Sequence, residues 1–207
     1  QEYIQRFGFE PEKHPPYLTM ALGAGSVTPL QMASAYSVFA NGGYRVDPFL
    51  IRRMVDSKGA VLFEAKPTHA REDATRVLDA RTAFVMDSML QEVTKTGTAA
   101  SARAKLGRND IAGKTGTAER YNSACSCYSG YTASFIGFAP ADQPKYVVSV
   151  TIQDPKGLHW GGALAGPVFK KVMGFVLQSE KVKPTPAADI FYSLTESTLK
   201  SKNGKSA

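Results

Sequence analysis

The stretch Gly113-Lys114-Thr115-Gly116-Thr117 combines small residues, one fixed positive charge and two hydroxyls within five positions. Glycine has no side chain, so Gly113 and Gly116 leave the backbone open to a closely approaching ligand. Residues two apart on a strand share a face, which places the hydroxyls of Thr115 and Thr117 together. The stretch therefore predicts a strand that binds an anionic ligand along its length, with Lys114 as the cation.

Two simpler interpretations compete with a binding strand. A phosphate-binding loop needs a glycine six residues before the lysine, but that position holds Arg108, and Gly107 lies one position too early. The spacing therefore excludes such a loop. Taken alone, the five residues favour an edge strand softened by glycine, with a solvated Lys114, because a Lys-Thr-Gly tripeptide is common. The surrounding sequence has to decide between this interpretation and a binding strand.

The surrounding sequence predicts an antiparallel meander covered by a helix. Three strand-like runs follow one another at 111–118, 132–138 and 146–152. The segment 121–130 and a proline-containing turn at 140–144 separate them. Pro167 is a suitable first residue for the helix. Its predicted buried face consists of Val168, Val172, Phe175 and Val176. This is an α+β arrangement.

The upstream half predicts two helices with a hairpin between them. Residues 28–41 have the order of a capping box with a first-turn proline, and the two glycines at 42–43 supply a stop. Residues 44–63 predict a hairpin with its turn at 56–59, and 66–76 predict a surface loop. Asp79 can cap the second helix, which Gly97 ends. Its predicted buried face consists of Ala83, Met86, Met89, Leu90 and Val93.

Composition and charge limit the possible classes of protein. The 207 residues are 43% hydrophobic and 21% charged, and no apolar run reaches the roughly 18 to 20 residues of a membrane span. The net charge of +7 is spread as +2, +3 and +2 over residues 1–110, 111–178 and 179–207. Without a basic stripe, zinc spacing or an aromatic RNA-binding motif, nucleic acid is not an expected partner.

The two cysteines, Cys125 and Cys127, are separated by a single residue. The histidines at 14, 69 and 159 are scattered, so neither a metal site nor a cofactor is expected. A disulfide across one residue is geometrically awkward but feasible at a hairpin tip. The redox state of the pair therefore stays open.

Several ordered blocks of sequence strongly resemble the C-terminal part of penicillin-binding transpeptidases. They read ALGAGSVTPLQMASAY at 21–36, FANGG at 39–43, GKTGTA at 113–118, YTASFIGFAP at 131–140, YVVSV at 146–150 and GALAGPVF at 162–169. The resemblance covers 1–178 and leaves 179–207 as a polar tail. It implies the α+β fold of these transpeptidases and of serine β-lactamases, an antiparallel sheet packed against helices, as a partial domain.

The resemblance also implies a chemistry. In this family the serine of an S-x-x-K motif attacks a D-alanyl-D-alanine peptide, an S-x-N motif assists proton movement, and the K-T-G strand docks the peptide or a β-lactam. It implies that Lys114, Thr115, Gly116 and Thr117 bind substrate, with Lys114 neutralising its carboxylate. The backbone N–H of Thr117 is expected to form half of the oxyanion hole. The implied partners are the stem peptides of peptidoglycan and β-lactams.

The sequence departs from the family pattern in one respect. No S-x-x-K precedes Lys114; the single match, at 197–200, is followed at once by an S-x-N at 201–203. Both lie in the polar tail, in the wrong order and without an apolar helix face to bury a serine–lysine pair, so coincidence is expected. We therefore expect a piece of an extracytoplasmic transpeptidase, anchored through a missing N-terminal half that carries the serine. The isolated chain is expected to be inactive.

Other assignments compete with this one. The alternative is a catalytically silent module of the same fold that binds peptidoglycan or a protein partner. A β-lactamase is less favoured, because no carboxylate that could activate water can be placed. The branch of the family is not assigned: residues 1 to about 110 look more like bifunctional class A enzymes, whereas 117–118 and 135–140 look more like monofunctional class B enzymes.

The remaining candidate residues are better explained by ordinary structural roles than by catalysis or binding. His159 and Trp160 lie near the expected cleft wall, where loop packing is the more common role, and Asp154 fits a strand-end turn. The tyrosines at 121, 128 and 131 fit a stiffened hairpin tip. The serines at 123, 126 and 129 have no neighbouring histidine in the sequence to activate them, so they are rejected as nucleophiles.

Overall fold

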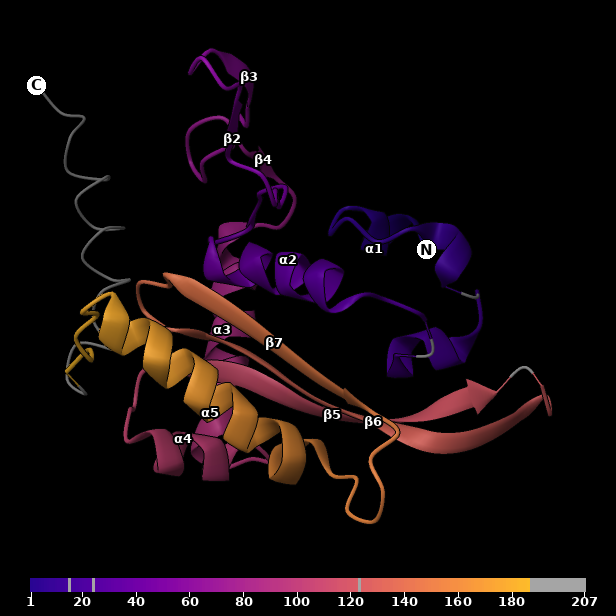
Figure 1. The fold of residues 1–207 in the computed structure, drawn as a ribbon. Helices are drawn as coiled ribbons and strands as arrows, with labels where there is room; N and C mark the ends of the chain where they lie inside the picture. The colour runs from indigo at the N-terminus through magenta and orange to yellow at the C-terminus, as the bar shows by residue number, and fades with distance from the viewer. Residues whose placement is uncertain (15, 24, 123, 187–207) are drawn as a thin grey trace, which may run out of the picture. The chain divides into compact units, whose positions relative to one another are not determined.

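The computed structural model describes residues 1–186 except 15, 24 and 123 (Figure 1). The chain divides into two compact units, Gln1–Met86 and Asp87–Ala207. Most of the polar tail, including the motif matches at 197–203, lies outside the described residues. Within the described part, no helix is both long and apolar enough to cross a membrane.

The first unit contains short helices and two small ladders, and the second contains the main sheet. The elements of the first unit are α1 (Glu2–Gln5), η1 (Pro11–Lys13), η2 (Leu18–Leu22), α2 (Pro29–Ala40), β1 (Tyr44–Arg45), β2 (Arg53–Val55), β3 (Val61–Glu64) and β4 (Thr75–Arg76). Helix α3 (Ala80–Lys95) runs from the first unit into the second. The second unit continues with α4 (Ala100–Leu106), β5 (Ala112–Asn122), β6 (Cys127–Ala139), β7 (Tyr146–Gln153) and α5 (Gly161–Ser179).

Helix α2 confirms the predicted capping box. Thr28 Oγ1 accepts the Gln31 N–H at 3.1 Å, and Gln31 Oε1 accepts the Thr28 N–H at 2.9 Å. The helix ends where Gly42 and Gly43 adopt φ values of 69° and 99°, a region that favours glycine. The helix contributes to the apolar core of this unit, which consists of Phe7, Ala35, Val38, Val77, Leu78 and Ala83.

The predicted hairpin is confirmed in its second part and wrong in its first. Strands β2 and β3 pair across a turn in which Asp56 Oδ1 accepts the N–H groups of Lys58 and Ala60, each at 2.8 Å. Strand β1, by contrast, pairs with β4 at the end of the predicted surface loop 66–76. A ladder of two residue pairs is too short to leave a periodic pattern in the sequence, which explains the error.

The main sheet confirms the predicted meander, with the strand order β5-β6-β7 and antiparallel pairing throughout. The first two strands are longer than predicted and take up most of the segment 121–130, pairing Asn122 with Cys127. The hairpin tip holds a disulfide between Cys125 and Cys127, with Ser126 between them at a φ of 49°. The extension was missed because its residues are largely exposed and polar, so they show no apolar alternation.

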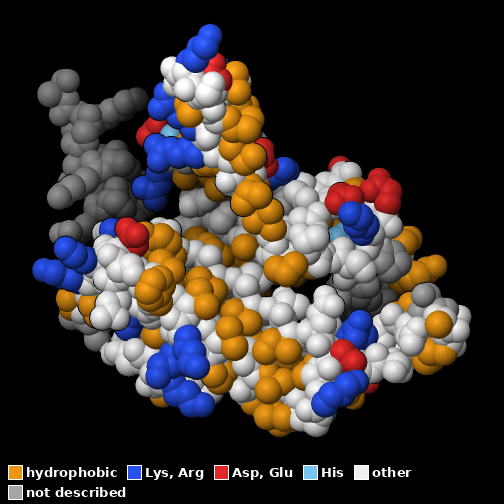
Figure 2. Space-filling model, viewed as in Figure 1, with side chains coloured by type: hydrophobic (Ala, Val, Ile, Leu, Met, Phe, Trp, Pro, Cys, Tyr) orange, Lys and Arg blue, Asp and Glu red, His pale blue; other side chains and the backbone are white. Residues whose placement is uncertain are grey.

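Helix α5 covers one face of this sheet (Figure 1). It begins at Gly161, so the prediction that Pro167 opens the helix is wrong. The predicted buried face is also wrong, because Val168, Val172 and Phe175 are 41%, 42% and 71% exposed. Hydrophobic side chains are accordingly visible at the surface over α5 in Figure 2. The buried residues recur every fourth position: Ala165, Phe169, Met173 and Leu177. Apolar residues on both sides of the helix made the sequence pattern ambiguous.

Helices α3 and α4 lie before the sheet in sequence. The buried face predicted for α3 is confirmed at Ala83 and Leu90 but wrong at Met89, which is 56% exposed. Helix α4 was not predicted. It packs against α5, and Ala102 joins the core formed around Phe135 and Phe169, whose rings lie 4.4 Å apart.

Residues 182–185, which follow α5, are hydrogen-bonded to a buried ion pair. Arg108 and Asp110 form this pair at 2.5 Å, and the Asp110 side chain is fully buried. Arg108 also donates to the carbonyl oxygens of Val182 and Lys183, at 3.0 and 3.2 Å, while Asp110 accepts the N–H of Thr185 at 3.0 Å. Charge-assisted hydrogen bonds of this kind are strong, so ordered structure continues past the end of α5.

One carboxyl group of the second unit is in an unfavourable environment for its charge. Burial raises the pKa of Asp87 to about 6; the neighbouring Asp142 adds to the rise, whereas the hydrogen bond from Gln91 and the charge of Lys95 oppose it. Gln91 Nε2 donates to Asp87 Oδ2 at 3.0 Å, and Oδ1 is buried without a hydrogen-bond partner among the described residues. The folded state therefore holds the proton more tightly than the unfolded state does.

The two faces of α5 give a test of the core. Phe169→Ala should lower the free energy of unfolding by about 3 to 5 kcal/mol, because it leaves a cavity against Phe135. Phe175→Ala removes the same ring from the exposed face of the same helix and should change stability by less than about 1 kcal/mol. Urea denaturation of both variants measures the difference; equal losses would contradict this assignment of the faces.

The raised pKa of Asp87 predicts a pH-dependent stability. Because the folded-state pKa lies above the unfolded value of 3.8, this group makes the protein less stable as pH rises from about 4 to 6. Asp87→Asn should therefore be more stable than the wild type at pH 7.5, by on the order of 1 to 3 kcal/mol, with a smaller gain at pH 4. Thermal denaturation at both pH values measures this. The control is Glu72→Gln, at an exposed carboxylate; a gain for Asp87→Asn that is independent of pH would refute the assignment.

Candidate functional site

The K-T-G segment, residues 113–117, lies within β5 at the edge of the main sheet. The direction of its backbone groups follows from the ladder on the far side of β6. Asp154 N–H donates to Tyr131 C=O at 2.9 Å, so odd-numbered residues of β6 bond to β7 and even-numbered ones bond to β5. The backbones of Ser134 and Gly116 therefore form hydrogen bonds to each other, and so do those of Ile136 and Lys114.

Thr115 and Thr117 occupy the alternate positions of the ladder, opposite Phe135 and Ala133. In an antiparallel pair the residues at such positions direct their N–H and C=O groups away from the neighbouring strand. The backbone N–H of Thr117 therefore points to the open edge of β5. No strand among the described residues pairs with that edge.

The side chains of the segment divide between the two faces of the sheet. Thr115 is paired with Phe135, which contacts α5, so the hydroxyls of Thr115 and Thr117 lie on the α5 face. This confirms that the two hydroxyls share a face. Lys114 and Gly116 lie on the opposite face, where a Cβ on Gly116 would come within 2.5 Å of Ser134 Oγ. A side chain at 116 would therefore require the Ser134 hydroxyl to rotate away.

Lys114 nevertheless brings its charge to the same edge as the hydroxyls. Its side chain is exposed, and Nζ donates to Thr115 C=O at 2.8 Å. Because that carbonyl points to the open edge, the ammonium lies at the edge as well. No acidic side chain among the described residues forms an ion pair with it.

The first turn of α5 packs directly on the K-T-G segment. Gly161 N–H donates to Thr117 Oγ1 at 3.0 Å. A Cβ on Gly161 would lie 2.2 Å from Gly116 O and 2.5 Å from Ser134 O, so only glycine fits this contact. Because Thr117 Oγ1 accepts from Gly161, its own proton is free to bond to a ligand. The sequence analysis did not single out Gly161; its signal was a glycine pair next to a predicted helix.

The loop between α3 and α4 supplies a residue that the sequence analysis also missed. Thr98 Oγ1 lies 2.8 Å from Thr115 Oγ1. Thr98 stands 17 positions before Thr115, in a segment without periodic pattern, so nothing in the sequence indicated that the two hydroxyls meet.

The aromatic residues noted in the sequence form a stack beside the segment. The rings of Tyr131 and His159 are stacked at 4.0 Å, and Trp160, 59% exposed, lies 4.7 Å from His159. Trp160 immediately precedes Gly161, so this stack leads to the helix start. Asp154 adopts a φ of 48° and is paired with Lys156 at 2.7 Å, which lowers the pKa of the Asp154 carboxyl.

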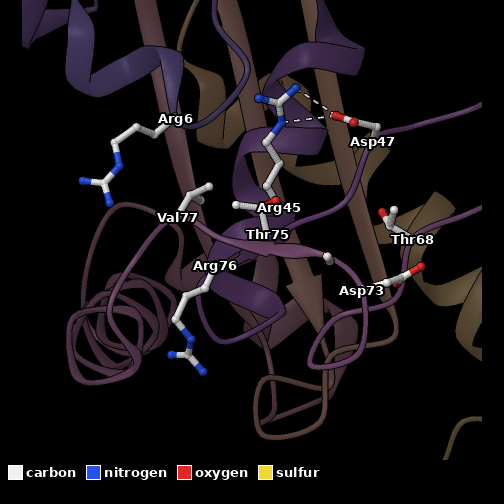
Figure 3. Close-up of a pocket in the computed structure, with 9 residues that line it drawn as sticks. Arg6, Arg45, Asp47, Thr68, Asp73, Thr75, Arg76 and Val77 are labelled. Atoms are coloured by element: carbon white, nitrogen blue, oxygen red, sulfur yellow. Dashed lines mark hydrogen bonds and ion pairs between the residues drawn. The ribbon is translucent and has the colours of Figure 1, made fainter.

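Elsewhere in the described chain, two arginines beside a cavity are already engaged with neighbouring side chains. A cavity of about 460 Å³ in the first unit is lined by arginines and carboxylates, and Arg45 donates to Asp47 there at 2.8 Å (Figure 3). The guanidinium of Arg76 is stacked over the Tyr44 ring at 4.4 Å, so it too is engaged. Among the described residues, no group of three His, Cys, Asp or Glu side chains is placed to hold a metal ion.

Comparison with known proteins agrees with this geometry. Residues 5–174 match the family model of the penicillin binding protein transpeptidase domain. Penicillin-binding protein 1A of Neisseria flavescens is 42% identical over 194 residues, which are 91% of this chain and 23% of that protein. Penicillin-binding protein 1A of Pseudomonas aeruginosa is 34% identical, across 86% of this chain and 26% of that protein.

Solved structures show the same fold. Penicillin-binding protein 1A of Haemophilus influenzae matches with a TM-score of 0.71 and 28% identity, covering 90% of this chain and 31% of that one. Penicillin binding protein 3 of Mycobacterium tuberculosis, complexed with ampicillin, also gives a TM-score of 0.71 at 28% identity, across 89% of this chain and 46% of that one. The resemblance in fold and sequence is confirmed.

The chain belongs to the penicillin-binding protein transpeptidase family and is part of such a domain. It is similar to the C-terminal region of penicillin-binding protein 1A, a class A protein. It spans about a quarter of the length of the curated relatives, 23% and 26% of the two named above.

The contact between α5 and the K-T-G segment can be tested with two glycines of the same helix. Gly161→Ala should destabilise the second unit by about 1 to 3 kcal/mol, because its Cβ collides with two backbone carbonyls that cannot move freely. Gly166→Ala is the matched control, since its Cβ would meet its nearest atoms at 3.8 and 3.9 Å; it should be neutral or slightly stabilising. Hydrogen exchange of residues 112–118 localises the effect, and unchanged exchange in Gly161→Ala would refute it.

Proposed function

We propose that this chain is the substrate-docking part of a peptidoglycan D,D-transpeptidase, an acyltransferase that cross-links stem peptides and is acylated by β-lactams. The observation that carries the proposal is the convergence at one open strand edge of an outward N–H from Thr117, the Lys114 ammonium and two threonine hydroxyls. The family membership gives this arrangement its reaction class.

The arrangement suits a peptide that ends in a carboxylate. A strand edge offers hydrogen bonds to an extended peptide. Lys114 neutralises the terminal carboxylate, and the free proton of Thr117 Oγ1 donates to it. The Thr117 N–H is the backbone donor for the oxyanion that forms when the scissile carbonyl is attacked. Removing one such donor typically raises the barrier by about 2.7 to 4 kcal/mol.

The attacking group must come from another part of the parent protein. No S-x-x-K precedes Lys114, and the match at 197–200 lies outside the described residues. Since relatives extend over roughly four times the matched length, we infer that an upstream part of the parent supplies the serine and the S-x-N motif. The parent then works outside the cytoplasm, where peptidoglycan is cross-linked, and the missing N-terminal half of the domain is a structural partner of this chain.

A catalytically silent binding module is the second candidate, favoured by the missing serine motif. Its recognition chemistry is the same, so it also binds D-Ala-D-Ala stem peptides along β5. The two candidates differ only in whether a covalent acyl-enzyme forms. The Mycobacterium tuberculosis relative has been solved in complex with aztreonam and with ampicillin, so β-lactams are suitable probes.

Labelled penicillin distinguishes the two candidates. The isolated 207-residue chain should form no covalent adduct, whereas the chain extended upstream to include the inferred S-x-x-K should form one. In the extended chain, Lys114→Gln should lower the second-order acylation rate constant by about tenfold or more, because the carboxylate loses a charged partner. Lys58→Gln, at the hairpin turn of the first unit, is the control and should leave the rate unchanged. An adduct on the isolated chain overturns the inference that the attacking serine lies upstream, and the absence of an adduct on the extended chain refutes the transpeptidase proposal.

A further inference from the structure

Thr98, in the loop between α3 and α4, forms a hydroxyl–hydroxyl hydrogen bond with the K-T-G segment. Its Oγ1 lies 2.8 Å from Thr115 Oγ1, a normal length for a hydrogen bond between hydroxyls. The bond joins the α3–α4 loop to the strand. Neither residue is fully buried, so both hydroxyls remain accessible to a ligand at the strand edge.

The proton count of this pair limits how Thr115 can act. Two hydroxyls carry two protons, and one of them lies between the oxygens, so the pair keeps a single proton for an outside acceptor. A lone threonine hydroxyl rotates among staggered positions. The bond to Thr98 holds the Thr115 side chain in one orientation and leaves the pair with one directed donor.

Packing holds Thr98 in position for this bond. A Cβ on Gly162 would lie 3.0 Å from Thr98 O and 3.4 Å from Thr115 Cγ2, so the first turn of α5 is in contact with both residues. The next residue, Ala99, is fully buried in the core around Phe135 and Phe169. The loop therefore has little freedom to move away from the strand.

We propose that Thr98 is a positioning residue for carboxylate recognition: its hydroxyl donates to Thr115 Oγ1, which orients the Thr115 side chain and leaves the Thr115 proton directed toward the substrate's terminal carboxylate. This inference rests on the proposed function of the K-T-G segment. Thr98 acts through Thr115 and takes no part in the acyl transfer itself. Its removal should therefore affect ligands that carry the carboxylate and spare those that lack it.

The test compares two substitutions in the chain extended upstream. Thr98→Val keeps the shape of the side chain and removes the hydroxyl, whereas Thr98→Ser keeps the hydroxyl. With a penicillin that carries its free carboxylate, Thr98→Val should lower the second-order acylation rate constant by about three- to tenfold, the effect of one hydrogen bond. Thr98→Ser should restore it to within about twofold. With the methyl ester of the same penicillin, both variants should match the wild type.

Thr96→Val is the matched control, because Thr96 lies on the same loop as Thr98 and its hydroxyl donates to Glu92 of α3, at 2.8 Å, instead of to β5. It should leave acylation by the free acid unchanged. Equal acylation of wild type and Thr98→Val by the free acid overturns the inference, and so does an equal loss with acid and ester, which would show a purely structural role.

A second measurement separates this inference from the proposed function. In the 207-residue chain, NMR couplings of the Thr115 side chain should report one χ1 rotamer in the wild type and averaging in Thr98→Val. Unchanged couplings overturn the inference even if the extended chain is acylated. Averaged couplings in a protein that no penicillin acylates would instead refute the transpeptidase proposal, while the Thr98–Thr115 coupling would stand.

Discussion

The contact between the first turn of α5 and the K-T-G segment is the constraint on which the site depends. Gly161 lies so close to the carbonyl oxygens of Gly116 and Ser134 that no side chain fits between them. The same residue donates its N–H to Thr117 Oγ1. A helix of 19 residues, anchored in the core through Phe169 and Met173, therefore fixes the position of one edge strand. Binding groups held on rigid elements need little reorganisation when a ligand arrives.

The chemistry of the site follows from which groups remain unpaired at that edge. The hydrogen-bonding pattern of the sheet leaves Thr117 N–H and Thr115 C=O outside the ladder. Lys114 donates to that carbonyl from the opposite face of the sheet. A cation and two hydroxyls therefore lie along the same strand, although their side chains start on different faces. The proposed docking of a peptide with a terminal carboxylate rests on this arrangement of groups along one strand edge.

The sequence predicted the parts of the fold that rest on local signals. The capping box at Thr28 and Gln31, the Asp56 turn and the three strands of the meander all follow from short-range patterns, and the structure contains each of them. The error over the buried face of α5 has its origin in tertiary packing. Helix α5 carries apolar residues on two sides, and only the sheet selects Phe169 over Phe175 for burial.

The candidate site could be proposed from its residues, whereas its geometry could not be predicted. Glycines, a lysine and threonines in one strand indicated an anionic ligand, and the family resemblance named the same positions. The roles of Gly161 and Thr98 could not be read from the sequence, because each acts through a contact with a residue at least 17 positions away. Such contacts leave no periodicity and no motif.

The buried ion pair of Arg108 and Asp110 extends the requirements of the fold beyond the end of α5. The family model stops at residue 174 and α5 ends at Ser179, yet the carboxylate of Asp110 accepts the N–H of Thr185. A protein shortened at the helix end would leave a fully enclosed charge lacking one of its donors, and a guanidinium facing water in place of two carbonyls. Electrostatics, more than secondary structure, thus shows that residues up to at least Thr185 must be kept in any shortened version of this protein.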